Sequence, residues 1–572
     1  MKLPIIISSC LSIVGLCACS SVHADNDDGI EAFEYRDVYL PDYNKKANHD
    51  LNLNFIDSDW GLWGHNLKDV LPDNPSLQAY AKRNGSSDAD QFCFTSNKLY
   101  DYIVDYIKGN FIFADSIRFA ILPNDNDIVC QCIDCVRIGN TKDDASPAVF
   151  YMIKRLADKF PKHQFYTSYY SSTKSLPDDV LPPNVGVIVS AIDYPLSASE
   201  TNEELAFMTL LNQWSEKTDK VYIWDYINNF DDYFTPAPIF SIMQRRLKLY
   251  RDSGVNGVFL NGSGNDYSTF AKLKKTVLAQ LLQNPDFDWE ELLRKSALEY
   301  YPEAGNDIAD FIILQEKMIQ NNGKSLPMYE GVEKARKIYL PEKEFVDFYN
   351  KIIRHKKIAS GEEKEELELM ADAMALTMLE LKRINRSLEG VDKLKERLGR
   401  LKDNDIHYYN EGAWSIEEYL SDYSFMEKDA IDTESSNLLK GVKLKSITPL
   451  DEDYTDISIV TDGFLGIPSN YHNGNLITSA DPKFSISIPR QDNMKNIKVW
   501  MVYNPGFRIG LPEEVYITSG GYTSVHKVPE RMQGSEHSFL EFDVPPGDED
   551  ITLTLVKNPE IRTMAIDEIQ AF

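Results

Sequence analysis

The sequence has few basic residues for its length. Lys and Arg total 60 of the 572 residues, against 89 Asp and Glu, which gives a formal net charge of −29 at pH 7. Such a surface repels the phosphate backbone of nucleic acids, and no basic patch stands out along the chain. We therefore expect no nucleic-acid partner.

Long apolar runs are also scarce. Beyond the N-terminus no segment reaches the roughly 18 consecutive apolar residues that a membrane-spanning helix needs. The first residues read "MKLPIIISSCLSIVGLCACSSVHADNDD", in which one lysine precedes an apolar run of signal-peptide length. "LCAC" resembles a bacterial lipobox that would lipidate Cys19, whereas "VHA" would be cut after Ala24. We favour the lipobox within a signal segment over residues 1–24. The expected location is the outer membrane or cell surface, otherwise the periplasm, with membrane contact only through the anchor.

Cysteine is absent after residue 135. Cys93 stands alone upstream, and Cys130, Cys132 and Cys135 form a C-x-C-x-x-C pattern. Four thiols can form a zinc site, or two disulfides, which an exported location permits. Neighbouring Cys130 and Cys132 do not pair easily in an extended chain. Both structural roles stay open, and the absence of a His–Cys partnership argues against a catalytic thiol.

Several familiar motifs are missing as well. Nothing resembles a serine triad, a phosphate-binding loop or a dinucleotide fingerprint, so no cofactor is expected. Tyr (31) and Trp (7) are plentiful, and these side chains suit stacking on neutral sugars. The composition therefore favours a glycan or glycoprotein as the partner.

Residues 31–285 alternate short apolar strands with helical stretches, which predicts an α/β domain of parallel βαβ units. The number of units favours a (β/α)8 TIM-like barrel. The predicted strands are "FEYRDVYL", "DLNLNFI", "SIRFAIL", "HQFYTSYY", "VGVIVSAI", "KVYIWDY" and "NGVFLNG".

The rest of the chain changes character twice. Residues 286–438 carry apolar residues at helical spacing, which predicts a helical domain. Residues 440–572 show period-two alternation between turn residues, which predicts a β-sandwich. Its opening "IVTDGFLGIPSNYHNG" and closing "MAIDEIQAF" resemble galactose-binding-like sandwiches.

Polar and aromatic residues recur after the predicted strands, where a barrel builds its site. In "PNDND", Asp125 and Asp127 share one face of an extended segment, a pattern that suits a carboxylate pair at a glycosidic bond. The same letters are also common in turns. Asp225 is a third catalytic candidate, although a strand-end Asp beside Trp is equally typical of a buried Trp with a capping Asp. The predicted substrate-binding residues are Trp63, His65, Asn66, Asn124, Tyr169, Trp224, Tyr226 and Asn261.

One residue type is missing at these strand ends. No glutamate directly follows any predicted barrel strand. In a glycosidase, aspartates would then carry the proton transfers, or a glutamate on a loop would do so.

Six segments together resemble a known family. They are "LWGHNL", "QFCFTS", "PNDNDIVCQCIDC", "VYIWDYINNF", "GVNGVFLNG" and "LLQNPDFDWEELL". In this order they resemble the bacterial domain of unknown function 4838, part of which is classed as glycoside hydrolase family 163. The resemblance covers residues 35–320. It implies a TIM-barrel relative of hexosaminidases, exported as a lipoprotein in gut Bacteroidetes, with endo-β-N-acetylglucosaminidase action on the core of complex N-glycans.

The resemblance carries over to few residues. Asp125 and the three clustered cysteines match the pattern "nD…C-x-C-x-x-C", and residues 224–226 match "W-D-Y". Related members often have an acidic residue where this chain has Asn261. By analogy with hexosaminidases, the substrate's 2-acetamido group would be the nucleophile in retaining chemistry. Asp125 and Asp127 would serve as the two carboxylates, with Asp225 as a substitute.

Two other functions remain open. The first is a non-catalytic glycan-binding lipoprotein, in which the same aromatic residues hold sugar. The second is an exo-glycosidase that acts on N-acetylhexosamine or uronic acid termini.

Overall fold

The computed structural model describes residues 31–41, 51–451, 454–478, 481–505, 508–529 and 537–572. Residues 32–572 form one compact unit, separate from residues 1–31. Cys19 and the expected signal segment lie outside the described residues. In the described ranges, every helix is too short or too polar to cross a membrane.

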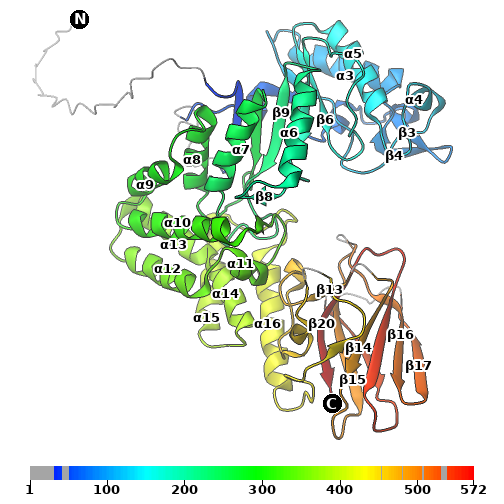
Figure 1. The fold of residues 1–572 in the computed structure, drawn as a ribbon, viewed down its shortest axis with the longest axis vertical. Helices are drawn as coiled ribbons and strands as arrows, with labels where there is room; N and C mark the ends of the chain where they lie inside the picture. Colours follow the sequence, from blue (N-terminus) through cyan, green and yellow to red (C-terminus); the bar gives the residue numbers. More distant parts are fainter. Residues whose placement is uncertain (1–30, 42–50, 452–453, 479–480, 506–507, 530–536) are drawn as a thin grey trace, which may run out of the picture. The chain divides into compact units, whose positions relative to one another are not determined.

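A parallel sheet organises the first part of the compact unit (Figure 1). Its strand order is β1-β10-β9-β7-β6-β5-β2, and every neighbouring pair is parallel. The strands are β1 (Tyr35–Tyr39), β2 (Trp60–Leu62), β5 (Arg118–Ala120), β6 (Gln164–Tyr169), β7 (Val185–Ser190), β9 (Val221–Tyr226) and β10 (Gly257–Asn261). The α/β prediction for this region is confirmed.

The prediction of a closed eight-stranded barrel is wrong. The sheet curls into a seven-stranded half-barrel whose outermost strands among the described residues are β1 and β2. The predicted strand "DLNLNFI" has no strand in its described part, because Asn52 has a φ of 55°, in the left-handed region, and helix α2 (Ile56–Asp59) begins at the last residue of the segment. Strand β2 follows instead and has only three residues.

Large aromatic side chains fill the concave face of the sheet. Tyr35, Trp60, Tyr166, Tyr222 and Phe259 are all nearly inaccessible to solvent and form one cluster. The rings of Tyr35 and Tyr222 stack with their centroids 5.4 Å apart. Alternate residues of a strand point to opposite faces, so the neighbouring Val and Ile residues pack against helices instead. The interior is therefore filled, which leaves the ends of the strands for a site.

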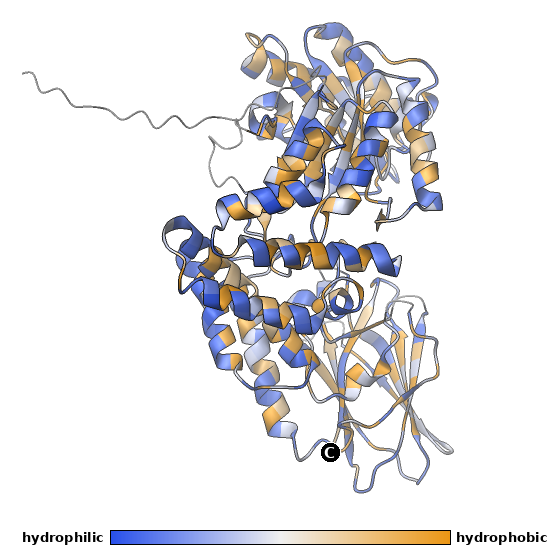
Figure 2. Cartoon of the chain, turned by 60° about the vertical axis from the view of Figure 1, so that its left-hand side comes forward, coloured by the Kyte–Doolittle hydropathy of each residue, from blue (hydrophilic) through white to orange (hydrophobic). Residues whose placement is uncertain are grey.

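Helices surround this sheet and continue beyond it. Those that accompany the sheet are α2, α3 (Asn97–Phe111), α4 (Ile133–Arg137), α5 (Ser146–Lys159), α6 (Asn202–Ser215), α7 (Phe240–Asp252) and α8 (Ala271–Gln283). A helical region follows, with α9 (Trp289–Tyr300), α10 (Gly305–Asn322), α11 (Val332–Ile338), α12 (Glu342–His355), α13 (Gly361–Ala373), α14 (Ala375–Ile384), α15 (Val391–Gly399) and α16 (Ile416–Thr433). These helices carry both apolar and polar residues, as Figure 2 shows, which suits helices buried on one side.

Two small antiparallel pairs complete this part. The hairpin β3 (Tyr80–Arg83) and β4 (Ser86–Phe92) precedes α3. Strand β8 (Leu196–Ser197) pairs with the distant β11 (Ser325–Leu326) and so links the sheet region to the helical region.

The C-terminal region consists of two antiparallel sheets that share one hydrophobic core. The first has the order β12-β14-β19-β16-β17 and the second has the order β13-β20-β15-β18. Their strands are β12 (Lys445–Ser446), β13 (Leu476–Thr478), β14 (Lys483–Ile488), β15 (Asn496–Val502), β16 (Pro512–Ser519), β17 (Tyr522–Lys527), β18 (His537–Asp543), β19 (Ile551–Lys557) and β20 (Met564–Ala571). Its galactose-binding-like character and the domain boundaries stay predictions.

Candidate functional site

The loop that follows β5 presents two aspartates to solvent. Asp125 and Asp127 are both exposed. The Tyr170 hydroxyl donates to Oδ1 of Asp125 at 3.0 Å, and the Ser171 hydroxyl donates to Oδ1 of Asp127 at 3.0 Å. Both donors directly follow β6, the neighbouring strand in the sheet. The two aspartates therefore lie at the carboxyl edge of the sheet, as the sequence predicts for a site.

A buried glutamine holds the backbone of this loop. Gln91, at the end of β4, accepts a hydrogen bond from the Asn124 amide at 3.0 Å and donates to the Asn124 carbonyl oxygen at 3.1 Å. It also donates to Oδ1 of Asn126 at 3.0 Å. The side chain of Asn124 donates to the Asp90 carbonyl oxygen at 2.8 Å. Asn124, predicted to bind substrate, thus anchors the loop to the β3–β4 hairpin.

Asp225 occupies a completely different environment. Its side chain is 0% exposed, and it lies 2.6 Å from Nη1 of Arg246, which is also 0% exposed. The Tyr250 hydroxyl donates to its other carboxylate oxygen at 2.6 Å. Because side chains alternate along a strand, Asp225 points toward α7 while Trp224 and Tyr226 point the other way. The proposed catalytic role of Asp225 is therefore not supported, since no substrate reaches a fully buried ion pair.

Two tryptophans and a histidine gather beside the aspartate loop. The rings of Trp63 and Trp224 are stacked, with centroids 5.0 Å apart and an interplanar angle of 8°. Nδ1 of His65 lies 2.6 Å from the carbonyl oxygen of Pro123, at the start of the loop, and its ring lies 5.8 Å from that of Tyr170. Strands β2, β5, β6 and β9 bring these residues together at one edge, and their role in substrate binding stays a prediction.

Asn66 has a local role in the structure. It is exposed, and its side chain donates to the carbonyl oxygen of Trp63 at 3.0 Å. This hydrogen bond closes the turn that carries Trp63 and His65.

The remaining predicted binding residues divide between the core and the edge of the sheet. Tyr169 packs with its ring 6.2 Å from that of buried Trp214, so its neighbour Tyr170 is the tyrosine that reaches the site. The Tyr226 hydroxyl lies 3.4 Å from Oγ of Ser190, and burial raises the pKa of Tyr226. Asn261 ends β10 directly beside Tyr226 in the strand register.

Glu411 also lies near this edge, although it belongs to the helical region, far from the sheet strands in the sequence. It lies on the loop before α16, which begins at a capping box formed by Ser415 and Glu418. Its amide donates to the Phe230 carbonyl oxygen at 2.9 Å, which ties the loop to the segment after β9. The Tyr329 hydroxyl donates to Oε2 of Glu411 at 3.0 Å.

The surroundings of Glu411 favour its protonated form. Desolvation is the main cause that raises the pKa of Glu411, and the negative charges of Asp231 and Asp125 raise it further. The hydrogen bond from Tyr329 acts in the opposite direction. Of these causes, the charge of Asp125 is the smallest.

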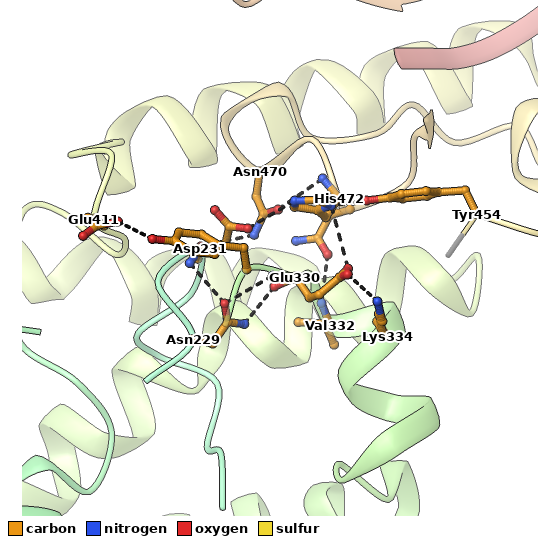
Figure 3. A network of polar contacts seen from close by, with 11 residues as sticks. Asn229, Asp231, Glu330, Val332, Lys334, Glu411, Tyr454, Asn470 and His472 are labelled. Carbon is orange, nitrogen blue, oxygen red and sulfur yellow. Dashed lines mark hydrogen bonds and ion pairs between the residues drawn. The ribbon is translucent and has the colours of Figure 1, made fainter. Parts of the chain in front are cut away.

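A polar network holds the segment after β9, whose Phe230 accepts the hydrogen bond from the Glu411 amide (Figure 3). Oδ2 of Asp231 lies 3.2 Å from Nε2 of His472, and Nδ1 of His472 lies 3.8 Å from Oε2 of Glu330. Asn229 donates to the Glu330 carbonyl oxygen at 2.8 Å, and Asn470 donates to that of Asp231 at 3.2 Å. Contacts from three distant parts of the chain therefore fix the loop after β9.

The arrangement provides the parts of an acid–base pair. Glu411 has a raised pKa and an exposed surface, whereas Asp125 accepts a hydrogen bond from Tyr170. Desolvation and the charge of Asp125 raise the pKa of Tyr170 to about 12, so its hydroxyl stays a donor at neutral pH. Two carboxylates in unequal environments can divide the roles of proton donor and anionic stabiliser.

Glu411 was not among the predicted residues. The only signal in the sequence was the missing strand-end glutamate, which left room for a loop glutamate without indicating which one.

The four cysteines come together next to the aspartate loop. The sulfur atoms of Cys93, Cys130, Cys132 and Cys135 lie within 4.8 Å of one another, and none of the four forms a disulfide.

Comparison with solved structures finds distant likenesses. A family GH115 4-O-methyl-α-glucuronidase with specificity for decorated arabinogalactans is 11% identical, with 85% of this chain and 68% of that chain covered and a TM-score of 0.38. A GH138 enzyme targeting pectin rhamnogalacturonan II is 9% identical, with coverages of 94% and 87% and a TM-score of 0.30. A fucose-binding module of Streptococcus pneumoniae is 14% identical and covers 24% of this chain and 97% of its own, with a TM-score of 0.19. A shared activity does not follow from similarity at this level.

Comparison with curated proteins gives no match. The sequence profile of a family described as a domain of unknown function, DUF4838, matches residues 21–312, which include the whole parallel sheet and the aspartate loop. The chain belongs to the DUF4838 family.

Proposed function

We propose that the chain is a glycoside hydrolase that uses Glu411 as the proton donor and Asp125 as its partner carboxylate. The observation that carries this proposal is the position of Glu411, an exposed glutamate that is tied to the segment after β9 and hydrogen-bonded by Tyr329, and whose pKa the charge of Asp125 helps to raise. A glycosidic bond is cleaved by one group that protonates the leaving oxygen and another that stabilises the positive charge on the sugar. A general acid needs a pKa near the working pH, and desolvation of Glu411 shifts its pKa in that direction.

The surrounding residues support a sugar as the substrate. The half-buried rings of Trp63 and Trp224 stack on each other, and His65, two residues after Trp63, contacts the start of the loop that carries Asp125. Aromatic faces pack well on the apolar faces of sugar rings, and His65 and Tyr226 can bind hydroxyl groups. Asp127, held by Ser171, is the other exposed carboxylate of this loop and the alternative partner for Glu411.

The family resemblance of the sequence motifs supports one substrate class. We propose glycans that contain β-linked N-acetylglucosamine, cleaved by endo action at the N-glycan core. In this reaction the acetamido oxygen of the substrate attacks the anomeric carbon while Glu411 protonates the leaving oxygen. Asp125 orients the acetamido N–H, and the Glu411 carboxylate then takes a proton from the water that opens the cyclic intermediate. We also propose that the protein is exported as a lipoprotein.

Mass spectrometry of a glycoprotein with complex N-glycans, incubated with the purified chain, tests this function. Endo action leaves one N-acetylglucosamine on the protein and releases a glycan that lacks it. Release of free monosaccharide would instead support the exo-glycosidase, and glycan binding without any product would support the non-catalytic alternative.

Variants assign the roles within the site. Glu411→Gln should lower kcat by about 10²–10⁴-fold, the usual contribution of a positioned acid or base. Asp125→Asn should also lower kcat, because it removes the negative charge that orients the acetamido N–H. Glu417→Gln is the matched control, because Glu417 is an exposed glutamate in the first turn of α16. Full activity in Glu411→Gln would exclude Glu411 as the proton donor.

A further inference from the structure

The four cysteines lie together at one end of the aspartate loop. Cys93 directly follows β4, Cys130 and Cys132 follow the loop, and Cys135 lies in α4. Cys93, Cys130 and Cys135 are buried and Cys132 is partly buried. Two segments separated in the sequence thus bring four thiols to one point.

The distances between the sulfur atoms distinguish a metal site from disulfides. Sγ of Cys93 lies 3.7 Å from Sγ of Cys132 and 3.8 Å from Sγ of Cys135. A disulfide bond needs about 2.05 Å between its sulfur atoms. A tetrahedral zinc ion with Zn–S distances of about 2.3 Å separates its ligand sulfurs by about 3.8 Å. Cys93 is also nearly equidistant from two other thiols, as expected for ligands around a common centre.

Hydrogen-bond donors surround the sulfur atoms. The Lys82 amide donates to Sγ of Cys130 at 3.2 Å, and the Cys135 amide donates to Sγ of Cys132 at 3.4 Å. Oγ1 of Thr95 lies 3.2 Å from Sγ of Cys135. Donors of this kind stabilise thiolate ligands and fix their orientation.

We propose that Cys93, Cys130, Cys132 and Cys135 bind one zinc ion in a closed tetrahedral site. Four protein ligands leave no open position, so the role of the ion is structural. The ion would join the end of β4 to the segment that follows the aspartate loop. Gln91, two residues before Cys93, holds the other end of the same loop through Asn124. This proposal does not depend on the glycosidase activity.

Elemental analysis of the full chain, purified without chelator or metal-binding tag, tests the site. We expect one zinc per chain and, under denaturing conditions, the mass of the fully reduced protein. Absence of metal together with the mass of a chain containing two disulfides would overturn the proposal. Iron in place of zinc would overturn the identity of the ion.

A variant and a substituted metal test the ligands. Cys132→Ser changes the most accessible ligand and should lower zinc affinity at least tenfold, whereas Ser87→Ala, in β4, should retain full zinc. If Cys132→Ser does not fold, the wild-type chain can be stripped with chelator and reloaded with Co²⁺. The charge-transfer and visible bands of a tetrahedral thiolate cobalt site are expected, and bands of an oxygen or nitrogen ligand set would overturn the assignment.

Hydrogen exchange tests the structural role. Removal of zinc should speed amide exchange in residues 121–135 and leave exchange in the C-terminal sheets unchanged. Unchanged exchange in residues 121–135 would show that the ion does not hold the loop.

Discussion

Asp125 and Asp225 both belong to the carboxyl end of the same parallel sheet, yet their surroundings are opposite. Asp125 is exposed on the loop beyond β5, and the Tyr170 hydroxyl donates to it. Asp225 is fully buried at the end of β9, between Arg246 and Tyr250 of α7. A position at the end of a strand therefore does not make an aspartate functional. The direction of its side chain and the partner that it meets decide its role.

The chemistry of the partners explains this difference. A hydroxyl donor leaves the Asp125 carboxylate accessible to a ligand, whereas the guanidinium of Arg246 neutralises Asp225 and donates to the carbonyl oxygens of Tyr194 and Pro195 as well. Burial of one of these charges without the other would be costly. The pair at β9 thus belongs to the interior of the fold, while the loop after β5 is available for a site.

The largest expected effect comes from breaking the buried pair. Asp225→Asn should lower the free energy of unfolding by about 3–5 kcal/mol, because it leaves the charge of Arg246 buried without its partner. Asp125→Asn should change the free energy by less than about 0.5 kcal/mol, as is usual for an exposed residue. Urea unfolding followed by tryptophan fluorescence measures both values. Equal losses in the two variants would remove the distinction between the two strand ends.

A smaller effect, on kcat/KM, is expected from removal of the hydrogen bond that orients Asp125. Tyr170→Phe removes a donor to a charged acceptor, an interaction of about 1.5–3 kcal/mol, so kcat/KM should fall at least about tenfold. Tyr169→Phe is a control in the adjacent position, because the Tyr169 ring packs against Trp214 in the core. Steady-state kinetics on a glycoprotein with complex N-glycans would show the difference, and similar activity in both variants would contradict a role for Tyr170.

The smallest expected effect is a shift in pH dependence. Activity should be lost as the pH rises through the raised pKa of Glu411, because the proton donor is then ionised. Asp231→Asn removes a negative charge that raises this pKa, so the alkaline limb of the kcat profile should move to lower pH. Glu417→Gln should leave the limb in place. A limb that moves to higher pH in Asp231→Asn would contradict the assignment of Glu411 as the acid.

Most elements of the sheet could be predicted because each strand carries its own apolar pattern. The segments around β5, β6, β7, β9 and β10 were all predicted as strands, and each is an internal strand of the sheet. The strand predicted at "DLNLNFI" was wrong, since period-two alternation does not reveal that Asn52 adopts a left-handed backbone conformation. The predicted closure of the barrel was also wrong. Closure requires β1 and β2, the two outermost strands, to pair with each other, and the apolar pattern of each strand does not specify that pairing.

The candidate site was predictable only where its residues lie next to strands. Trp63, His65, Asp125 and Trp224 come together because parallel strands end at one edge. Glu411 could not be identified, since its place depends on its own contacts with Phe230 and Tyr329, which lie far from it in the sequence.

The sequence by itself determined the α/β character of the first part, the two sheets of the last part and the exposed aspartates after β5. Each follows from local patterning, in which neighbouring residues specify an element without reference to the rest of the chain. Only the tertiary structure decided that Asp225 is paired, that Glu411 is tied to the segment after β9 and that the four thiols converge. These features join residues far apart in the sequence, and the packing that joins them arises only when the separate elements have folded against one another.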